Sequence, residues 1–128
     1  MCSKRKFYIC KHCGNIFGVI QDSGLLPICC GEEMTELVAN TTDAATEKHV
    51  PMVTVEGNTV SATVGEVIHP MVENHFIQWI ILVSEQGVQR KCLKPGDAPT
   101  VSFALTEGDK AVAVYEYCNL HGLWVKEC

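Results

Sequence analysis

A thiol and an imidazole lie three residues apart near the end of the chain, as Cys118 and His121 within the segment 117–124. A Cys-x-x-His pair can bind a metal, although this spacing alone is a weak signal in a chain of this size. Thiolate sulfur and imidazole nitrogen are ligands for zinc and for redox metals such as iron and copper. We therefore interpret the pair as part of a metal site whose other ligands come from elsewhere in the chain.

The remaining histidines decide how this pair is interpreted. The chain has five histidines, and four of them lie at the edges of hydrophobic runs, where loops would hold them: His49, His69, His75 and His121. Four imidazoles and one thiolate are too rich in nitrogen for a structural zinc site, which takes four ligands and usually several cysteines. Five protein ligands on a metal that can take six leave one position open to a small molecule. An open position on a redox metal predicts chemistry.

Four further cysteines form a second candidate site near the N-terminus, as the knuckle Cys10-x-x-Cys13 and the adjacent pair Cys29 and Cys30. This set is typical of a tetrathiolate metal site, and the alternative is a vicinal disulfide or two buried thiols without a role. Neighbouring residues in an extended chain point to opposite faces, so the backbone must kink to bring both adjacent sulfurs to one ion. We expect His12, between the knuckle cysteines, to be a solvated side chain rather than a ligand.

The bulk properties limit the class of protein. A chain of 128 residues with 47% hydrophobic side chains can bury one good core and a small appended module. Its net charge of −5 provides no broad basic surface for nucleic acid, and no window reaches the apolar length of a membrane span. The basic residues 4–6 are not followed by the apolar segment of a signal peptide, so we expect a cytoplasmic protein. Eight cysteines in that compartment indicate metal ligation rather than disulfides.

We expect two domains, residues 1–38 and 39–128. The first is too short to fold without help, and metal binding is the usual remedy. Short strands are expected at residues 6–9 and 15–20 of this module. A polar linker at residues 40–43 should lead into a short helical turn over 43–47, with Asp43 as its cap.

Beyond residue 50, short runs of β-branched and aromatic residues alternate with turn residues, which predicts antiparallel strands. The longest run, residues 76–84, is suited to the centre of a sheet. The expected strands are residues 52–55, 59–64, 76–84, 88–93, 100–105, 111–117 and 123–126. Seven such strands are the number found in an immunoglobulin-like sandwich.

Taken together, these segments resemble desulfoferrodoxin, the two-iron class of superoxide reductase. The resemblance rests on the four N-terminal cysteines, the segments 47–51, 69–71 and 75–80, and Tyr117-Cys118-Asn119-Leu120-His121-Gly122. It runs the length of the chain, with no departure at a ligand position. It implies a mainly β protein, in which a small desulforedoxin-like metal module precedes an immunoglobulin-like antiparallel β-sandwich.

The resemblance also implies two iron atoms per chain and the residues that bind them. The first iron would be bound by Cys10, Cys13, Cys29 and Cys30. The second would be bound by His49, His69, His75 and His121 as equatorial ligands and by Cys118 as the axial ligand. The implied reaction converts superoxide, one electron and two protons to hydrogen peroxide, with the electron supplied by a small external donor such as rubredoxin. A homodimer is implied as well.

Two charged residues beside His49 are candidates for catalytic roles. Lys48, which we expect on an exposed loop, would steer the superoxide anion toward the open position. Glu47 could bind the sixth position of oxidised iron, as the resemblance suggests, or relay protons through water. For both, the alternative is an ordinary solvated surface residue.

The remaining three cysteines, Cys2, Cys92 and Cys128, fall outside the motifs and receive no role. We expect Cys92 to be a small apolar core residue and the two terminal cysteines to be frayed and exposed.

Three other functions use similar residues. A non-enzymatic electron carrier would need no open position, and a zinc-stabilised binding module would be colourless. A dismutase would release oxygen as well as peroxide and would consume no donor electrons. The residues also leave open whether the tetrathiolate centre relays electrons, and we favour a mainly structural, dimer-forming role for it.

Overall fold

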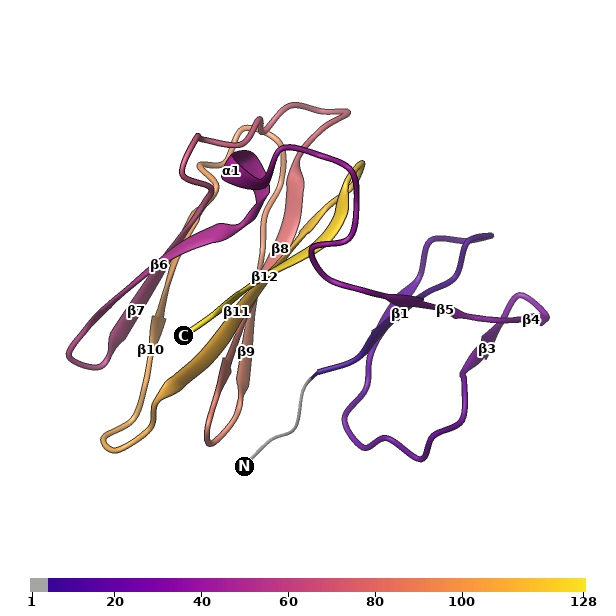
Figure 1. Ribbon diagram of the computed structural model, residues 1–128, viewed down its shortest axis with the longest axis horizontal. Helices are drawn as coiled ribbons and strands as arrows, with labels where there is room; N and C mark the ends of the chain where they lie inside the picture. The colour runs from indigo at the N-terminus through magenta and orange to yellow at the C-terminus, as the bar shows by residue number, and fades with distance from the viewer. Residues whose placement is uncertain (1–4) are drawn as a thin grey trace. The chain divides into compact units, whose positions relative to one another are not determined.

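The computed structural model describes residues 5–128, so Cys2 lies outside the described residues (Figure 1). The chain divides into two compact units, with the division between Val38 and Ala39. Strands dominate both units, and the described residues form one helix, of four residues. Within this described part, no helix is long and apolar enough to cross a membrane.

The first unit is built from very short strands. Its main sheet has the antiparallel order β2-β1-β5, with β1 at Phe7–Ile9, β2 at Ile16–Gly18 and β5 at Thr35–Leu37. A second pair, β3 (Ile28–Cys29) and β4 (Glu32–Glu33), forms a hairpin with two residues in each strand. Tyr8, Cys10 and Met34 form the small buried cluster of this unit. One of the candidate metal ligands therefore belongs to the core itself.

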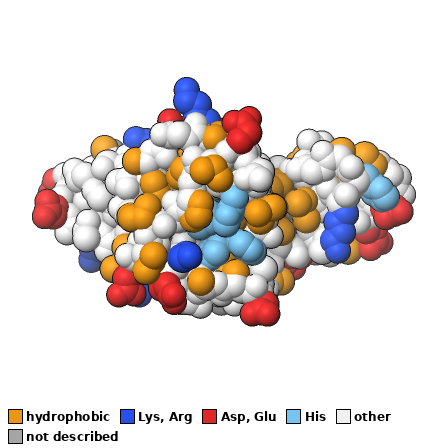
Figure 2. Space-filling view, turned by 90° about the horizontal axis from the view of Figure 1, so that it is seen from above, with side chains coloured by type: hydrophobic (Ala, Val, Ile, Leu, Met, Phe, Trp, Pro, Cys, Tyr) orange, Lys and Arg blue, Asp and Glu red, His pale blue; other side chains and the backbone are white. Residues whose placement is uncertain are grey.

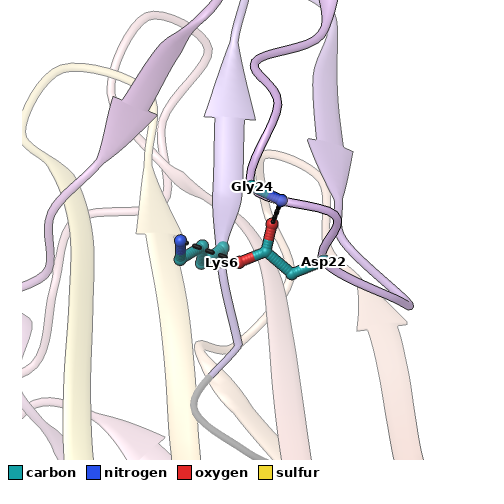
Figure 3. Close-up of polar contacts among 3 residues, drawn as sticks. All are labelled: Lys6, Asp22 and Gly24. Carbon is teal, nitrogen blue, oxygen red and sulfur yellow. Dashed lines mark hydrogen bonds and ion pairs between the residues drawn. The ribbon is translucent and has the colours of Figure 1, made fainter.

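The turn at residues 22–24 is closed by the carboxylate of Asp22 (Figure 3). The Lys6 ammonium lies 2.9 Å from Asp22 Oδ2, and the Gly24 amide donates a 2.8 Å hydrogen bond to Asp22 Oδ1. The bond from Lys6, followed by that from Gly24, lowers the pKa of Asp22 below its ordinary value of 3.8. The same contact raises the pKa of Lys6 above 10.5.

The second unit is a sandwich of two antiparallel sheets. One sheet has the order β10-β7-β6 and the other β12-β11-β8-β9. Its elements are α1 (Thr46–His49), β6 (Pro51–Glu56), β7 (Thr59–Val64), β8 (Ile77–Ser84), β9 (Val88–Cys92), β10 (Thr100–Ala104), β11 (Ala111–Cys118) and β12 (Gly122–Glu127). The predicted fold class is confirmed, and each of the seven expected strands is present with its ends within two residues of the prediction.

The core lies between the two sheets. Alternate residues of β7, Val60, Ala62 and Val64, are fully buried and pack with Ile80 and Phe103 from other strands. Burial of each valine, isoleucine or phenylalanine side chain stabilises a fold by about 1.5–3 kcal/mol relative to exposure. The sandwich therefore has a hydrophobic core of its own.

Three expectations about local structure are wrong. The helix begins at Thr46 rather than near Asp43, and the residue at its N-cap, Ala45, makes no side-chain capping bond. Lys48 consequently lies on α1 and not on a loop. Cys92 is exposed, because β9 is an edge strand whose side chains are mostly open to solvent. Cys128 is exposed as expected, although its amide donates to the Val112 carbonyl at 2.9 Å and so is not frayed.

Candidate metal centres

The five candidate ligands of the second site meet at one end of the sandwich, the end occupied by α1 (Figure 1). His49 is the last residue of α1, and His69 and His75 lie on the connection between β7 and β8. Cys118 ends β11, and His121 lies in the turn to β12. The nitrogen and sulfur atoms that these side chains offer all lie within 4.8 Å of one another. Residues separated by up to 72 positions thus converge on one point.

The four imidazoles form a closed ring. Each packs edge to face against its two neighbours, in the cyclic order His49, His69, His75, His121, with ring centroids 4.6–5.1 Å apart. The sulfur of Cys118 lies 3.8 Å from Nδ1 of His121. Four nitrogen donors therefore surround a common centre, with one sulfur donor beside them.

Hydrogen bonds on the outer side of the ring decide which nitrogens face inward. The Nδ1 atoms of His49 and His69 lie 2.7 and 2.6 Å from the carbonyl oxygens of Ala45 and Pro70, so both nitrogens donate a proton. Each ring then carries its lone pair on Nε2, and these two Nε2 atoms lie 3.2 Å apart. Two nitrogens bound to one ion at right angles would lie roughly 3.0 Å apart, from a metal–nitrogen distance of about 2.1 Å. A shared cation accounts for this contact, whereas two facing lone pairs would repel.

The third histidine gives an independent sign of a cation. Nε2 of His75 is buried, and the described residues supply it with no hydrogen-bond partner. Buried polar atoms without a partner are rare and costly in folded proteins. The donor set therefore fits a metal ion that accepts this nitrogen.

Burial also sets the protonation of the donors. It lowers the pKa of His49 and His75 and brings the pKa of His69 to about 4, so these rings are neutral at pH 7, as metal ligation requires. Burial raises the pKa of the Cys118 thiol, while hydrogen bonds from the amides of Leu120 and His121 oppose this shift. A bound metal would displace the thiol proton.

The site is open to solvent on one side. His49 and His69 are buried, whereas His75 and His121 are half-buried. Figure 2 shows histidine side chains at the surface with hydrophobic side chains around them. Exposed hydrophobic residues on the loops of this end include Val67, Ile68, Val72 and Leu120. A small molecule could reach the ring from this side.

The charged pair expected at the site, Glu47 and Lys48, is held by backbone contacts. Both side chains are exposed on α1. The Val67 amide donates to the Glu47 carbonyl at 2.9 Å. A Cβ atom on Gly65 would lie 2.7 Å from that carbonyl oxygen and 2.9 Å from the Lys48 carbonyl carbon, so this position has room only for glycine. The connection after β7 therefore fixes the helix that carries both charges.

The sequence analysis did not predict the roles of two polar residues close to Cys118, Asn119 and Glu116. The Asn119 side chain accepts a 2.9 Å bond from the Phe76 amide and donates a 3.1 Å bond to the Asn74 carbonyl, which ties the turn to the loop carrying His75. The position of Asn119, next to a candidate ligand in a tight turn, is the sequence feature that could have indicated this role.

Glu116 is fully buried, and burial raises its pKa to about 9. Side chains two residues apart on a strand face the same side, and Val114 and Cys118 lie on the core side of β11, so this spacing could have predicted that Glu116 points inward.

The four cysteines of the first unit also meet at one point. Their sulfurs lie within 4.8 Å of one another, and those of Cys13 and Cys29 are 3.6 Å apart. Sulfurs on a tetrahedral ion would lie roughly 3.8 Å apart, from a metal–sulfur distance of about 2.3 Å. Cys30 and Gly31 have φ angles of 52° and 75°, which is the kink expected at the adjacent pair. All four are free thiols, so the vicinal disulfide is not formed.

Charge within this cluster favours a cation. A hydrogen bond from the Cys13 amide is the main cause that lowers the pKa of Cys10 to about 6, which makes Cys10 a thiolate at pH 7. Hydrogen bonding with Cys10 raises the pKa of Cys30 to about 12. His12 is exposed and lies 3.0 Å from Glu32, outside the sulfur cluster, as expected.

Comparison with known proteins agrees with both sites. The family model described as desulfoferrodoxin matches residues 41–127. The desulfoferrodoxin of Nitratidesulfovibrio vulgaris is 47% identical over 127 residues, which cover 99% of each chain. The solved structure of the superoxide reductase from Treponema pallidum is 38% identical, with a TM-score of 0.83 over 98% of this chain and 100% of that one.

A one-iron superoxide reductase from Giardia intestinalis is similar over a shorter part. It is 31% identical, with a TM-score of 0.55, and the match covers 65% of this chain and 98% of that one. The tetrathiolate group and the group of four histidines and one cysteine match the two iron sites of desulfoferrodoxin. The chain belongs to the desulfoferrodoxin family.

Proposed function

We propose that the protein is a superoxide reductase, an oxidoreductase that converts superoxide, one electron and two protons to hydrogen peroxide. One observation carries the proposal: four imidazoles and one thiolate converge on a point that is open to solvent on one side. The similar proteins from Treponema pallidum and Giardia intestinalis are superoxide reductases. Bound at this site, iron would supply the single electron that superoxide receives.

The chain's own residues would hold that iron and keep one position free. The iron would be held by the imidazoles of His49, His69, His75 and His121 and by the thiolate of Cys118. The carbonyls of Ala45 and Pro70 orient two of the rings by accepting their Nδ1 protons. Amide bonds to the Cys118 sulfur would moderate the electron density that the thiolate gives to the metal.

Glu47 and Lys48 would serve the open side. Superoxide is an anion approaching a chain of net charge −5, so its capture requires local positive potential. Lys48 is adjacent to a ligand and exposed, which allows it to supply that potential. Glu47 would occupy the sixth position of oxidised iron or pass protons through water.

The tetrathiolate iron would chiefly hold the first unit folded, with domains at residues 1–38 and 39–128. The similarity to a one-iron reductase over 65% of this chain supports a catalytic domain that needs only one of the two centres. Electron relay by the tetrathiolate iron is a further hypothesis. An unchanged turnover rate with a physiological donor after replacing Cys13 by serine would contradict an obligatory relay.

The electron would come from a small donor protein of the rubredoxin type, in the cytoplasm. The described cysteines are free thiols, which supports a reducing compartment.

We also propose a homodimer, because the small first unit exposes large apolar side chains: Ile20 is 94% exposed, Leu25 80% and Ile28 70%. Light scattering at several concentrations would test this assembly.

The stoichiometry of products tests the proposed activity. A reductase forms one peroxide for each superoxide and each donor electron, and it releases no oxygen. Oxygen evolution without consumption of donor electrons would show a dismutase instead. Metal analysis with a visible spectrum provides the companion test: about two irons per chain are expected from the two ligand sets, whereas a zinc module would be colourless.

A further inference from the structure

The Trp124 side chain contacts two of the four histidines. Its indole ring stacks on the imidazole of His49, with centroids 4.9 Å apart and an interplanar angle of 24°. Its Nε1–H donates a 3.0 Å hydrogen bond to the carbonyl oxygen of His121. Trp124 is not one of the proposed ligands, so its contacts with two of them need an explanation of their own.

The two histidines that Trp124 contacts come from elements that are distant in sequence. His49 ends a four-residue helix, and His121 lies in the turn between β11 and β12. A helix this short is marginal by itself, so tertiary contacts must fix its last residue. The Nε2 atom of His49 lies 3.1 Å from Nδ1 of His121, so a small movement of either element would alter the spacing of these donors.

Trp124 is suited to fix that spacing, because it is itself rigidly held. It is 2% exposed and pairs with Glu116 in the regular register of β11 and β12. One face of the indole prevents His49 from rotating about its side-chain bonds, while the N–H anchors the turn that carries His121. Groups that orient ligands from outside the donor set typically change metal affinity about 10–100-fold when they are removed.

We propose that Trp124 is a positioning residue, which sets the spacing of His49 and His121 and so the retention and geometry of the metal they share. The proposal rests on the proposed iron site but needs no turnover for its test. The substitution Trp124→Phe would keep an aromatic face against His49 and lose the N–H, whereas Trp124→Leu would lose both contacts.

The chain offers a matched control. Trp79 on β8 also stacks on an aromatic ring, that of Tyr117, with centroids 5.5 Å apart and an interplanar angle of 13°, rather than on a histidine. Trp79→Phe therefore makes the same chemical change in the same sandwich. The tetrathiolate centre provides a second control within each sample, because its iron is bound by other residues.

The experiment challenges iron-loaded protein with a chelator and follows the loss of iron from each centre by its absorption. We expect Trp124→Phe to release iron from the histidine centre about 10-fold faster, and Trp124→Leu closer to 100-fold faster. The tetrathiolate centre and the Trp79→Phe protein should release iron at wild-type rates. The electron paramagnetic resonance signal of the ferric histidine centre should change in Trp124→Phe and not in Trp79→Phe. Wild-type release and an unchanged signal in Trp124→Phe would overturn the proposal.

A measurement on the wild-type chain decides the matter if the Trp124 variants do not fold. In protein loaded with Zn²⁺, the indole N–H of Trp124 should exchange with solvent more slowly than in metal-free protein, because a metal on His121 stiffens the turn that accepts its bond. Trp79→Phe assigns the two indole signals. Equal exchange rates with and without Zn²⁺ would contradict the coupling. None of the three readouts involves superoxide, so failure of the proposed activity would be seen separately.

Discussion

The two metal centres rest on different kinds of support. In the first unit, strands of two or three residues surround the four cysteines, and Cys10 itself is part of a buried cluster with Tyr8 and Met34. In the second unit, Cys118 also belongs to the buried core cluster, but none of the four histidines does, and the other members of the cluster, such as Val60 and Ile80, are not metal ligands. The first metal thus replaces a core, whereas the second is added to one.

This difference implies different consequences of losing each metal. Residues 5–38 should depend on their metal for structure, because their strands bury too little apolar surface. The sandwich should keep its fold without metal and lose its chemistry. Four substitutions test this comparison.

The largest effect is expected from Cys118→Ser. Removing a residue that only supports a metal ligand typically lowers activity by about 10–100-fold. Loss of the Cys118 thiolate, a ligand itself, should lower the rate of reaction with superoxide by more than this. Pulse radiolysis measures this rate. The sandwich should remain folded, with a lower melting temperature because the serine hydroxyl is buried in the core. Cys92→Ser is the control, since Cys92 is an exposed thiol on the same sandwich. A Cys118→Ser protein with the wild-type rate would show that the axial ligand is wrongly assigned.

Cys13→Ser should have the opposite pattern. Removing one of four sulfurs should release the first metal and unfold residues 5–38, while the β6–β12 sandwich remains folded and reacts with superoxide. Amide chemical shifts would report each unit separately. Retention of native shifts in residues 5–38 without metal would contradict the claim that the metal replaces a core.

Lys48→Ala should have a moderate effect that is confined to the second centre. Loss of one nearby positive charge corresponds to about 1 kcal/mol in water, or roughly fivefold in the rate with superoxide at low salt. The difference should shrink as salt is added. Lys110→Ala makes the same change at the far end of β11, roughly 25 Å from Cys118 for eight residues of strand. Equal rates for the two variants would remove the steering role.

The smallest effect is expected from Asp22→Asn, which removes the exposed pair of Asp22 with Lys6 in the first unit. The pKa of Asp22 is lowered, so its contribution is present above the unfolded value of 3.8 and is lost as pH falls through the folded value. The pKa of Lys6 is raised, so its contribution is present below 10.5 and lost as pH rises beyond it. Urea unfolding followed by tetrathiolate absorption should show the variant slightly less stable at about pH 5–9. An identical midpoint would show that the pair contributes nothing.

Much of the sandwich could be predicted because its signals are local. Runs such as 59–64 alternate fully buried apolar residues with polar residues that are only partly buried or exposed, and Gly57 allows the positive φ angle of 59° in the turn before that run. Beyond that, the prediction failed where distant contacts decide the structure. β5 is polar and short, and it forms a strand only because it pairs with β1. Helix α1 begins at Thr46 because Glu47 and His49 are fixed by tertiary and backbone bonds rather than by a cap at Asp43.

The candidate ligands could be named from residue types and from the resemblance, since few side chains bind metals and each stood beside a turn. Their support could not be derived in the same way. The stacking of Trp124 on His49 joins residues that are distant in sequence, and no local pattern specifies it. The exposure of Cys92 depends on the order of strands within a sheet, which places β9 at an edge.

The most direct test of the account follows both centres optically after a single small dose of superoxide is generated in the fully reduced, iron-loaded protein. The account predicts that the absorption of the histidine–cysteine centre changes first, at a rate proportional to protein concentration, with one peroxide formed for each superoxide. A first change in the tetrathiolate absorption, or no change in the absorption of the histidine–cysteine centre, would contradict it.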